Sequence, residues 1–222
     1  MQLTDSSLYA LLLNWSPDGT QVLFTGVSKK GRFRAFVART EGGKPIMLLP
    51  KESEDQIDST WSADGNEVVF ASAQITDPKC DLRILDIANH TVKTVPGSLG
   101  LFGPRWSPDG RYIAAESTDE LNLRVFDTKT QRWSTLLENV RTSWPNWSRD
   151  SHAIYYVHVA EGDRNVSRIR ATGGKPERIL DLKDLHFTGT WAGAMTIDPT
   201  GAPLMLRDTG SDDIFALTLD LR

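Results

Sequence analysis

Short runs of β-branched, aromatic and other hydrophobic residues recur along the whole chain, separated by polar stretches rich in glycine, aspartate and serine. Three groups of strand candidates repeat in a fixed order: 21–25, 67–71, 111–115, 153–157 and 203–207; then 33–37, 82–86, 121–125, 166–170 and 214–218; then 46–49, 92–95, 134–137 and 178–180. No window of ten or more residues shows the hydrophobic period of a helix. Short strands at regular spacing predict an all-β fold.

The same short string precedes the first strand candidate of each repeat. Its copies are 15–19 (WSPDG), 61–65 (WSADG), 106–110 (WSPDG) and 147–151 (WSRDS), with a degenerate fifth copy at 197–201 (IDPTG). Serine and aspartate oxygens accept hydrogen bonds from nearby backbone amides, and glycine tolerates positive φ, so each string predicts a tight turn. The copies lie 46, 45, 41 and 50 residues apart, a period that accommodates four short strands with their turns.

We therefore predict a single domain, 1–222, folded as a five-bladed β-propeller of four-stranded antiparallel blades, because a period as long as a whole sheet favours a propeller over a sandwich. The predicted blades are roughly 8–50, 51–96, 97–138, 139–182, and 183–222 together with 1–7. The fifth unit lacks a fourth strand, and we expect residues 1–7 to supply it by pairing with strand 214–218, which closes the ring. The alternative is a domain cut from a longer propeller.

Besides the tryptophan strings, the repeats share Leu-Asp or Phe-Asp at strand ends and a Gly-Gly-Lys-Pro turn. These motifs stand at 85–86, 126–127, 42–45 and 173–176. With them, nearly the whole chain resembles the TolB-like, WD-repeat-like bacterial β-propellers. This resemblance implies a platform that binds proteins, often in the periplasm. The segment 204–217 also resembles the end of propeller regions in bacterial sensor and winged-helix regulatory proteins, which implies a sensing role within a larger protein.

Composition and charge narrow the possible functions. With 39% hydrophobic and 24% charged residues the chain can build a packed core, and its net charge of −4 argues against a nucleic-acid-binding surface across the domain. The single cysteine, Cys80, excludes an internal disulfide and a cysteine-based zinc site. No apolar run reaches the ~18 residues of a membrane span, and the N-terminus shows no signal-peptide pattern. We expect a monomer with no nucleic-acid partner and no membrane insertion.

Several chemistry-bearing residues of the repeats have structural explanations. We expect the repeated tryptophans to pack between neighbouring blades rather than to form an aromatic binding cage. We expect the turn aspartates to cap their turns rather than to bind a metal, since each blade contributes one. The four histidines lack metal-binding spacing, and no hydrolase nucleophile or phosphate loop occurs, so no metal or cofactor is predicted. The residues concerned are Asp18, Asp64, Asp109 and Asp150, and His90, His152, His158 and His186.

Candidate binding residues lie where propellers bind ligands, at the rim of the central channel. They are Asp58, Arg105, Arg141, Trp144, His186 and Trp191. Arg105 and Arg141 would donate hydrogen bonds to a polar peptide or a small anion. We predict a non-enzymatic protein-interaction or sensor propeller that binds a protein, peptide or small polar ligand at its channel face. The alternatives are a hydrolase or lyase with a metal in the channel, and a solvated rim without a ligand.

Ring closure by the N-terminal residues leads to a direct test. If residues 1–7 complete the last blade, deleting them exposes a sheet edge and lowers the melting temperature by several degrees (roughly 1 kcal/mol shifts a domain of this size by ~2–4 °C). Calorimetry on the full chain and the deletion variant measures this shift. An unchanged melting temperature would exclude closure by this segment.

Overall fold

The computed structural model describes residues 8–27, 31–51, 53–185, 193–198 and 200–206, and these form eighteen β-strands and no helix. The strands are β1 (Tyr9–Trp15), β2 (Gln21–Val27), β3 (Phe33–Arg39), β4 (Ile46–Met47), β5 (Ile57–Trp61), β6 (Glu67–Ala71), β7 (Leu82–Asp86), β8 (Thr91–Thr94), β9 (Leu101–Trp106), β10 (Tyr112–Ser117), β11 (Leu123–Asp127), β12 (Arg132–Leu137), β13 (Thr142–Trp147), β14 (Ala153–His158), β15 (Asn165–Arg170), β16 (Glu177–Asp181), β17 (Met195–Ile197) and β18 (Pro203–Met205). The prediction of an all-β fold is confirmed.

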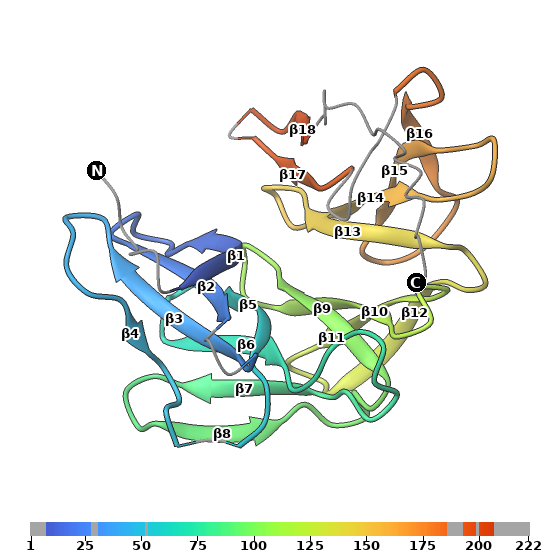
Figure 1. Ribbon diagram of the computed structural model, residues 1–222. Coiled ribbons are helices and arrows are strands. Elements are labelled where there is room, and N and C mark those ends of the chain that lie inside the picture. Colours follow the sequence, from blue (N-terminus) through green and yellow to red (C-terminus); the bar gives the residue numbers. More distant parts are fainter. Residues whose placement is uncertain (1–7, 28–30, 52, 186–192, 199, 207–222) are drawn as a thin grey trace, which may run out of the picture.

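Four antiparallel sheets follow one another along the chain, and each contains four strands in sequence order: β1–β4, β5–β8, β9–β12 and β13–β16. A fifth sheet contains β17 and β18. The first strands of successive sheets lie next to each other, β1 beside β5, β5 beside β9, β9 beside β13 and β13 beside β17. Figure 1 shows the resulting propeller arrangement, with the sheets in chain order from blue to red and their first strands on the inner side.

The prediction of five four-stranded blades is wrong for the described residues, which form four such blades and a two-stranded fifth sheet. In the fifth copy Ile197 replaces the tryptophan, Asp198 stands in place of the serine and Thr200 in place of the aspartate, so the Ser–Asp pair of the other turns is lost. Asp198 accepts hydrogen bonds from Thr200 and Ala202 instead. The predicted closure pairs 1–7 with 214–218. Both segments lie outside the described residues, so closure stays a prediction.

Each tryptophan string forms a tight turn closed by its serine and aspartate. In the first turn, Ser16 Oγ donates to Asp18 over 2.6 Å and accepts from the Gln21 amide, while Asp18 accepts from the Thr20 amide. The other three complete copies repeat this network. These hydrogen bonds lower the pKa of the turn aspartates, and the pKa of Asp150 falls to about 2. The aspartates therefore cap turns, as predicted.

The repeated tryptophans pack mainly between blades. Trp147 is buried, stacks on Tyr112 of the preceding blade with ring centroids 6.0 Å apart, and donates its indole N–H to the Arg105 carbonyl oxygen over 2.8 Å. Trp61 packs against the core of the first blade, and Trp106 against the core shared by the second and third. Trp15 differs, because it is 66% exposed. The predicted packing between blades is therefore confirmed for three of the four tryptophans.

Hydrogen bonds also join the inner strands directly, through the residue before each tryptophan. Asn14 Nδ2 donates to the Ser59 carbonyl oxygen over 2.9 Å, and Asn146 Nδ2 donates to that of Met195 over 2.9 Å. Thr60 Oγ1 donates to the Pro104 carbonyl oxygen over 3.2 Å and accepts from the amide of Trp106. The third blade has Arg105 at this position, and there the indole of Trp147 makes the connection instead.

Replacing a bridging hydroxyl by a methyl group tests the contribution of these bonds. Thr60→Val keeps the shape of the buried side chain but removes its hydrogen bonds with the Pro104 carbonyl and the Trp106 amide, so we expect a loss of about 1–2 kcal/mol in the free energy of unfolding. Thr94→Val, at an exposed position of β8, should change it by less than ~0.5 kcal/mol. Urea unfolding measures both, and equal effects would contradict the bridging role.

Candidate functional site

One irregular residue occurs at the same place in each of the first four inner strands. Three positions before the repeat tryptophan the backbone is left-handed: φ is +52° at Leu12, +51° at Asp58, +62° at Gly103 and +57° at Trp144. The strand register shifts at these same points. Such β-bulges redirect a side chain out of the regular strand alternation. The repeat therefore presents one position per blade to a common hollow.

The four bulge residues line a hollow of about 520 Å³, called the channel pocket below. Apolar side chains form most of its wall: Leu11, Leu12, Phe33, Ile57, Ile75, Phe102 and Pro145. The polar groups are fewer and include Asp58, Arg105, Glu116 and Glu120. An apolar cavity of this size with a few converging polar groups is typical of ligand-binding sites.

A buried ion pair lies in the channel pocket. Arg105 Nη1 lies 2.9 Å from Asp58 Oδ1, and the two side chains are only 14% and 6% exposed. Arg105 Nη1 also donates a hydrogen bond to the Pro104 carbonyl oxygen over 3.0 Å. The contact between Arg105 and Asp58 lacks hydrogen-bond geometry. Asp58 Oδ1 is therefore buried without a hydrogen-bond donor among the described residues. The pair joins the second and third blades and leaves one carboxylate oxygen able to accept a further donor.

Glu116, from the second strand of the third blade, is a second buried carboxyl group in the pocket. Thr142 Oγ1 of the fourth blade donates to Glu116 Oε1 over 2.8 Å. Burial raises the pKa of Glu116 to about 8, and the neighbouring Glu120 and Asp58 add to this, while the Thr142 hydrogen bond and Arg105 oppose it. Around neutral pH this group is therefore largely protonated and can donate a hydrogen bond.

The structure brings three of the six predicted binding residues together, namely Asp58, Arg105 and Trp144. Arg141 lines a separate hollow and pairs over 3.0 Å with Glu120, which borders the channel pocket. His186 and Trp191 lie outside the described residues. Arg105, which we expected to donate to a ligand, already faces Asp58 with its guanidinium group, and its role toward a ligand stays a prediction.

Glu116 was not predicted from the sequence. It follows two alanines in a second strand, without any motif around it, and its direction depends on the register shift between Ala114 and Glu116. The available signal is a single acidic residue at the end of an otherwise apolar strand. Such a signal is weak, because strand ends often reach solvent.

Across the described ranges, no three His, Cys, Asp or Glu side chains gather closely enough to hold a metal ion. The same part of the chain contains no helix with the length and apolarity that a membrane crossing needs.

Alanine substitutions separate the buried arginine from the exposed one. Arg105→Ala leaves Asp58 as an unpaired buried charge, so we expect the free energy of unfolding to fall by about 3 kcal/mol. Arg141→Ala removes a side chain that is 58% exposed and should change it by less than ~0.5 kcal/mol. Urea unfolding of both variants decides this, and similar losses would contradict the assignment.

The raised pKa of Glu116 makes stability depend on pH. Below the unfolded value of 4.5 the group is protonated in both states; between 4.5 and about 8 only the folded state holds the proton, so its contribution is lost as the pH rises. We expect the full chain to lose stability relative to Glu116→Gln between about pH 5 and 8, on the order of 3 kcal/mol. Unfolding curves measured across this range test it; parallel pH profiles would refute it.

Comparison with known proteins bears on the fold. No family model matches the sequence, and no curated protein matches it. Among solved structures, TolB from Acinetobacter baumannii superposes with a TM-score of 0.70 at 16% identity, over 87% of this chain and 47% of its own. A protein from Agrobacterium tumefaciens assigned as a TolB superposes with a TM-score of 0.66 at 20% identity, over 78% of this chain and 67% of its own.

A third similar structure is a chain of a nidogen/laminin complex, with a TM-score of 0.66 at 12% identity, covering 87% of this chain and 70% of its own. The chain thus spans about half of the Acinetobacter TolB and about two thirds of the other two. Identities this low identify an architecture rather than an activity. Together with the sheet order, they show that this chain has the fold of a TolB-like β-propeller.

Proposed function

We propose that this chain is a non-enzymatic protein-interaction propeller whose channel pocket binds a protein, a peptide or a small polar ligand. The observation that carries the proposal is the convergence of Asp58, Arg105 and Glu116 at one apolar hollow. Its volume of about 520 Å³ lies within the usual range for ligand sites, ~300–1,000 Å³. The walls suit an apolar or aromatic side chain, and the polar groups would orient it.

The polar groups also indicate which ligand chemistry fits. The cationic groups nearest the pocket are already paired, Arg105 with Asp58 and Arg141 with Glu120. This arrangement disfavours the small anion that the sequence alone allowed. Asp58 Oδ1 is buried beside Arg105 and has no hydrogen-bond donor among the described residues, so a ligand ammonium, amide or hydroxyl group that reaches it would satisfy it. The ligand we propose therefore combines an apolar side chain with a hydrogen-bond donor.

The similar structures agree with a binding role without establishing one for this chain. One of them belongs to a complex between nidogen and laminin, and two carry the TolB name. A role as the sensing part of a larger protein, and a periplasmic location, rest on sequence resemblance and stay predictions.

Selection of peptides from a random display library tests this proposal. Peptides that bind the full chain should combine aromatic or aliphatic residues with a hydrogen-bond donor, and calorimetry gives their affinities. Trp144→Ala removes part of the pocket wall, and we expect it to weaken binding by about tenfold or more.

Ile46→Ala is the matched control, because Ile46 is a 63% exposed apolar residue on the outermost strand of the first blade. It should change the affinity by less than about twofold. The proposal fails if the selected peptides bind Trp144→Ala as tightly as the unmodified chain, or if both variants lose affinity equally.

A further inference from the structure

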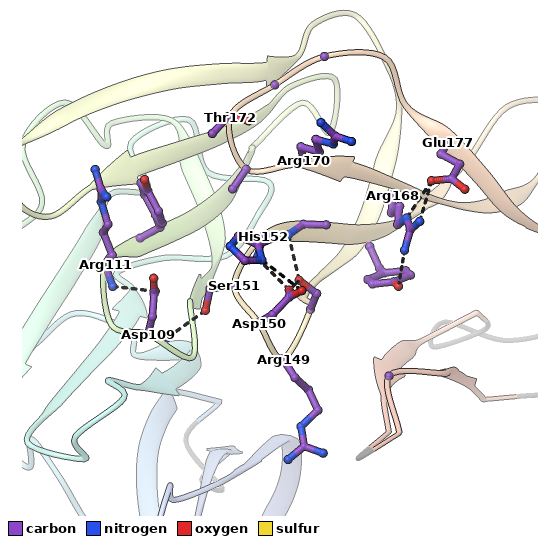
Figure 2. A pocket seen from close by; sticks show the side chains of 18 of the residues that line it. Asp109, Arg111, Arg149, Asp150, Ser151, His152, Arg168, Arg170, Thr172 and Glu177 are labelled. Atoms are coloured by element: carbon purple, nitrogen blue, oxygen red, sulfur yellow. Dashed lines mark hydrogen bonds and ion pairs between the residues drawn. The ribbon is translucent and has the colours of Figure 1, made fainter.

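A second hollow, of about 1090 Å³, lies among the turns that join first to second and third to fourth strands. Its border includes two turns of the fourth blade, Ser148–Ala153 and Ala171–Lys175. Asp109 and Arg111 of the third blade and Thr200 and Gly201 between β17 and β18 complete it. In an antiparallel blade these turns lie at the opposite end from the loops that carry Glu120 and the channel pocket. We call this hollow the turn groove; Figure 2 shows it from close by.

The turn groove is rich in positive charge although the whole chain carries a net charge of −4. The described residues lining it include five cationic side chains and three carboxylates, so cations predominate. They are Arg111, Arg149, Arg168, Arg170 and Lys175, and Asp109, Asp150 and Glu177. In Figure 2 the four labelled arginines are spread around the turn that carries Asp150 and His152 instead of forming one cluster.

The three carboxylates already have donors. Asp109 accepts from Ser107 Oγ and the Arg111 amide, and Asp150 accepts from Ser148 Oγ and the His152 amide. Glu177 accepts from Arg168 Nε and pairs with its Nη2, both over 2.9 Å. Hydrogen bonds from neutral donors leave Asp109 and Asp150 charged, and Arg168 neutralises only Glu177. The lining therefore keeps a surplus of two positive charges over its carboxylates.

Two cations remain available for a ligand. Neither Arg170 nor Lys175 has a hydrogen-bond or ion-pair partner for its side chain among the described residues, and both are exposed. They flank the turn that contains Gly173 and Gly174, where an added Cβ would meet nothing within 4 Å. A ligand can therefore approach both the charged side chains and the turn backbone.

Two tyrosines hold other arginines of the groove in place. The guanidinium of Arg111 lies 4.9 Å from the ring centroid of Tyr112, and that of Arg168 lies 5.9 Å from that of Tyr155. Arg168 also contacts the Tyr155 hydroxyl over 3.3 Å. Cation–π contacts of this kind fix arginine side chains at little further cost in entropy. The groove thus combines fixed arginines with two freer cations.

We propose that the turn groove binds a carboxylate-rich peptide segment of a partner protein. Spaced cations suit spaced carboxylates, and arginine forms two-pronged hydrogen bonds with this group. The hollow is far larger than a single anion requires. A nucleic-acid strand fits less well, because the rings of Tyr112 and Tyr155 already carry Arg111 and Arg168 and are poorly placed to stack on bases. The inference goes beyond the channel-pocket proposal and does not depend on it.

The first blade supplies a matched control. Its turn repeats the sequence pattern, with Arg39 in the place of Arg170 and Lys44 in the place of Lys175. The backbone is the same as well, since the amide of Gly42 bonds to the Arg39 carbonyl as that of Gly173 bonds to the Arg170 carbonyl. Neither control residue lines the turn groove.

Fluorescence polarisation with labelled octaglutamate on the full chain tests the proposal. We expect saturable binding that weakens as salt rises, because exposed ion pairs are screened. The double variant Arg170→Glu/Lys175→Glu should lower the affinity by about tenfold or more, and Arg39→Glu/Lys44→Glu by less than about twofold. The neutral pair Arg170→Gln/Lys175→Gln should give an intermediate loss and serves if the charge reversal impairs folding.

Three results would overturn the proposal: no saturable binding of octaglutamate, equal losses in the groove and first-blade variants, or tighter binding of an oligothymidylate of the same length than of the peptide. Trp144→Ala should leave octaglutamate binding unchanged, because it alters only the channel pocket. The two proposals can therefore fail separately.

Discussion

The contact between successive inner strands is the interaction on which the rest of this molecule depends. Each blade is a small sheet that cannot bury both faces alone, so it is stabilised by its neighbour. In three of the four complete blades the residue before the repeat tryptophan makes this contact by a hydrogen bond to the next inner strand. Trp61, Trp106 and Trp147 add to it by packing against the preceding blade. Where Arg105 replaces the usual Asn or Thr, the indole of Trp147 supplies the missing bond.

The same repeat explains why a pocket forms at the channel. Every complete blade has a bulge three residues before its tryptophan, but the side chain there differs: Leu12, Asp58, Gly103 and Trp144. Glycine suits position 103 because its φ of +62° lies in the left-handed region, whereas a Cβ there would make only ordinary contacts with Asp58 Oδ2 and Glu116 Oε2, at 3.5 and 3.8 Å. The four blades thus share one backbone conformation at the channel. The side chains at the bulge position differ from blade to blade, and this difference produces a pocket with apolar walls and buried carboxyl groups.

The sequence predicted the elements that repeat and missed those that do not. The tryptophan strings located the turns and inner strands, and these placed Asp58, Arg105 and Trp144 near the channel. The pairing of Arg105 with Asp58 could not be predicted, because the two residues are 47 positions apart in the sequence and their contact depends on how the second and third blades pack together. Cys80 shows the same limit: charged residues flank it in the sequence, yet the thiol is buried in the core.

Native-state hydrogen exchange tests the account most directly, because it reports the opening free energy of each strand. If the inner-strand contacts hold the blades together, the amides of β5, β9 and β13 will exchange most slowly and share one opening free energy. Faster exchange in these strands than in the outer strands β8, β12 and β16 would contradict the account.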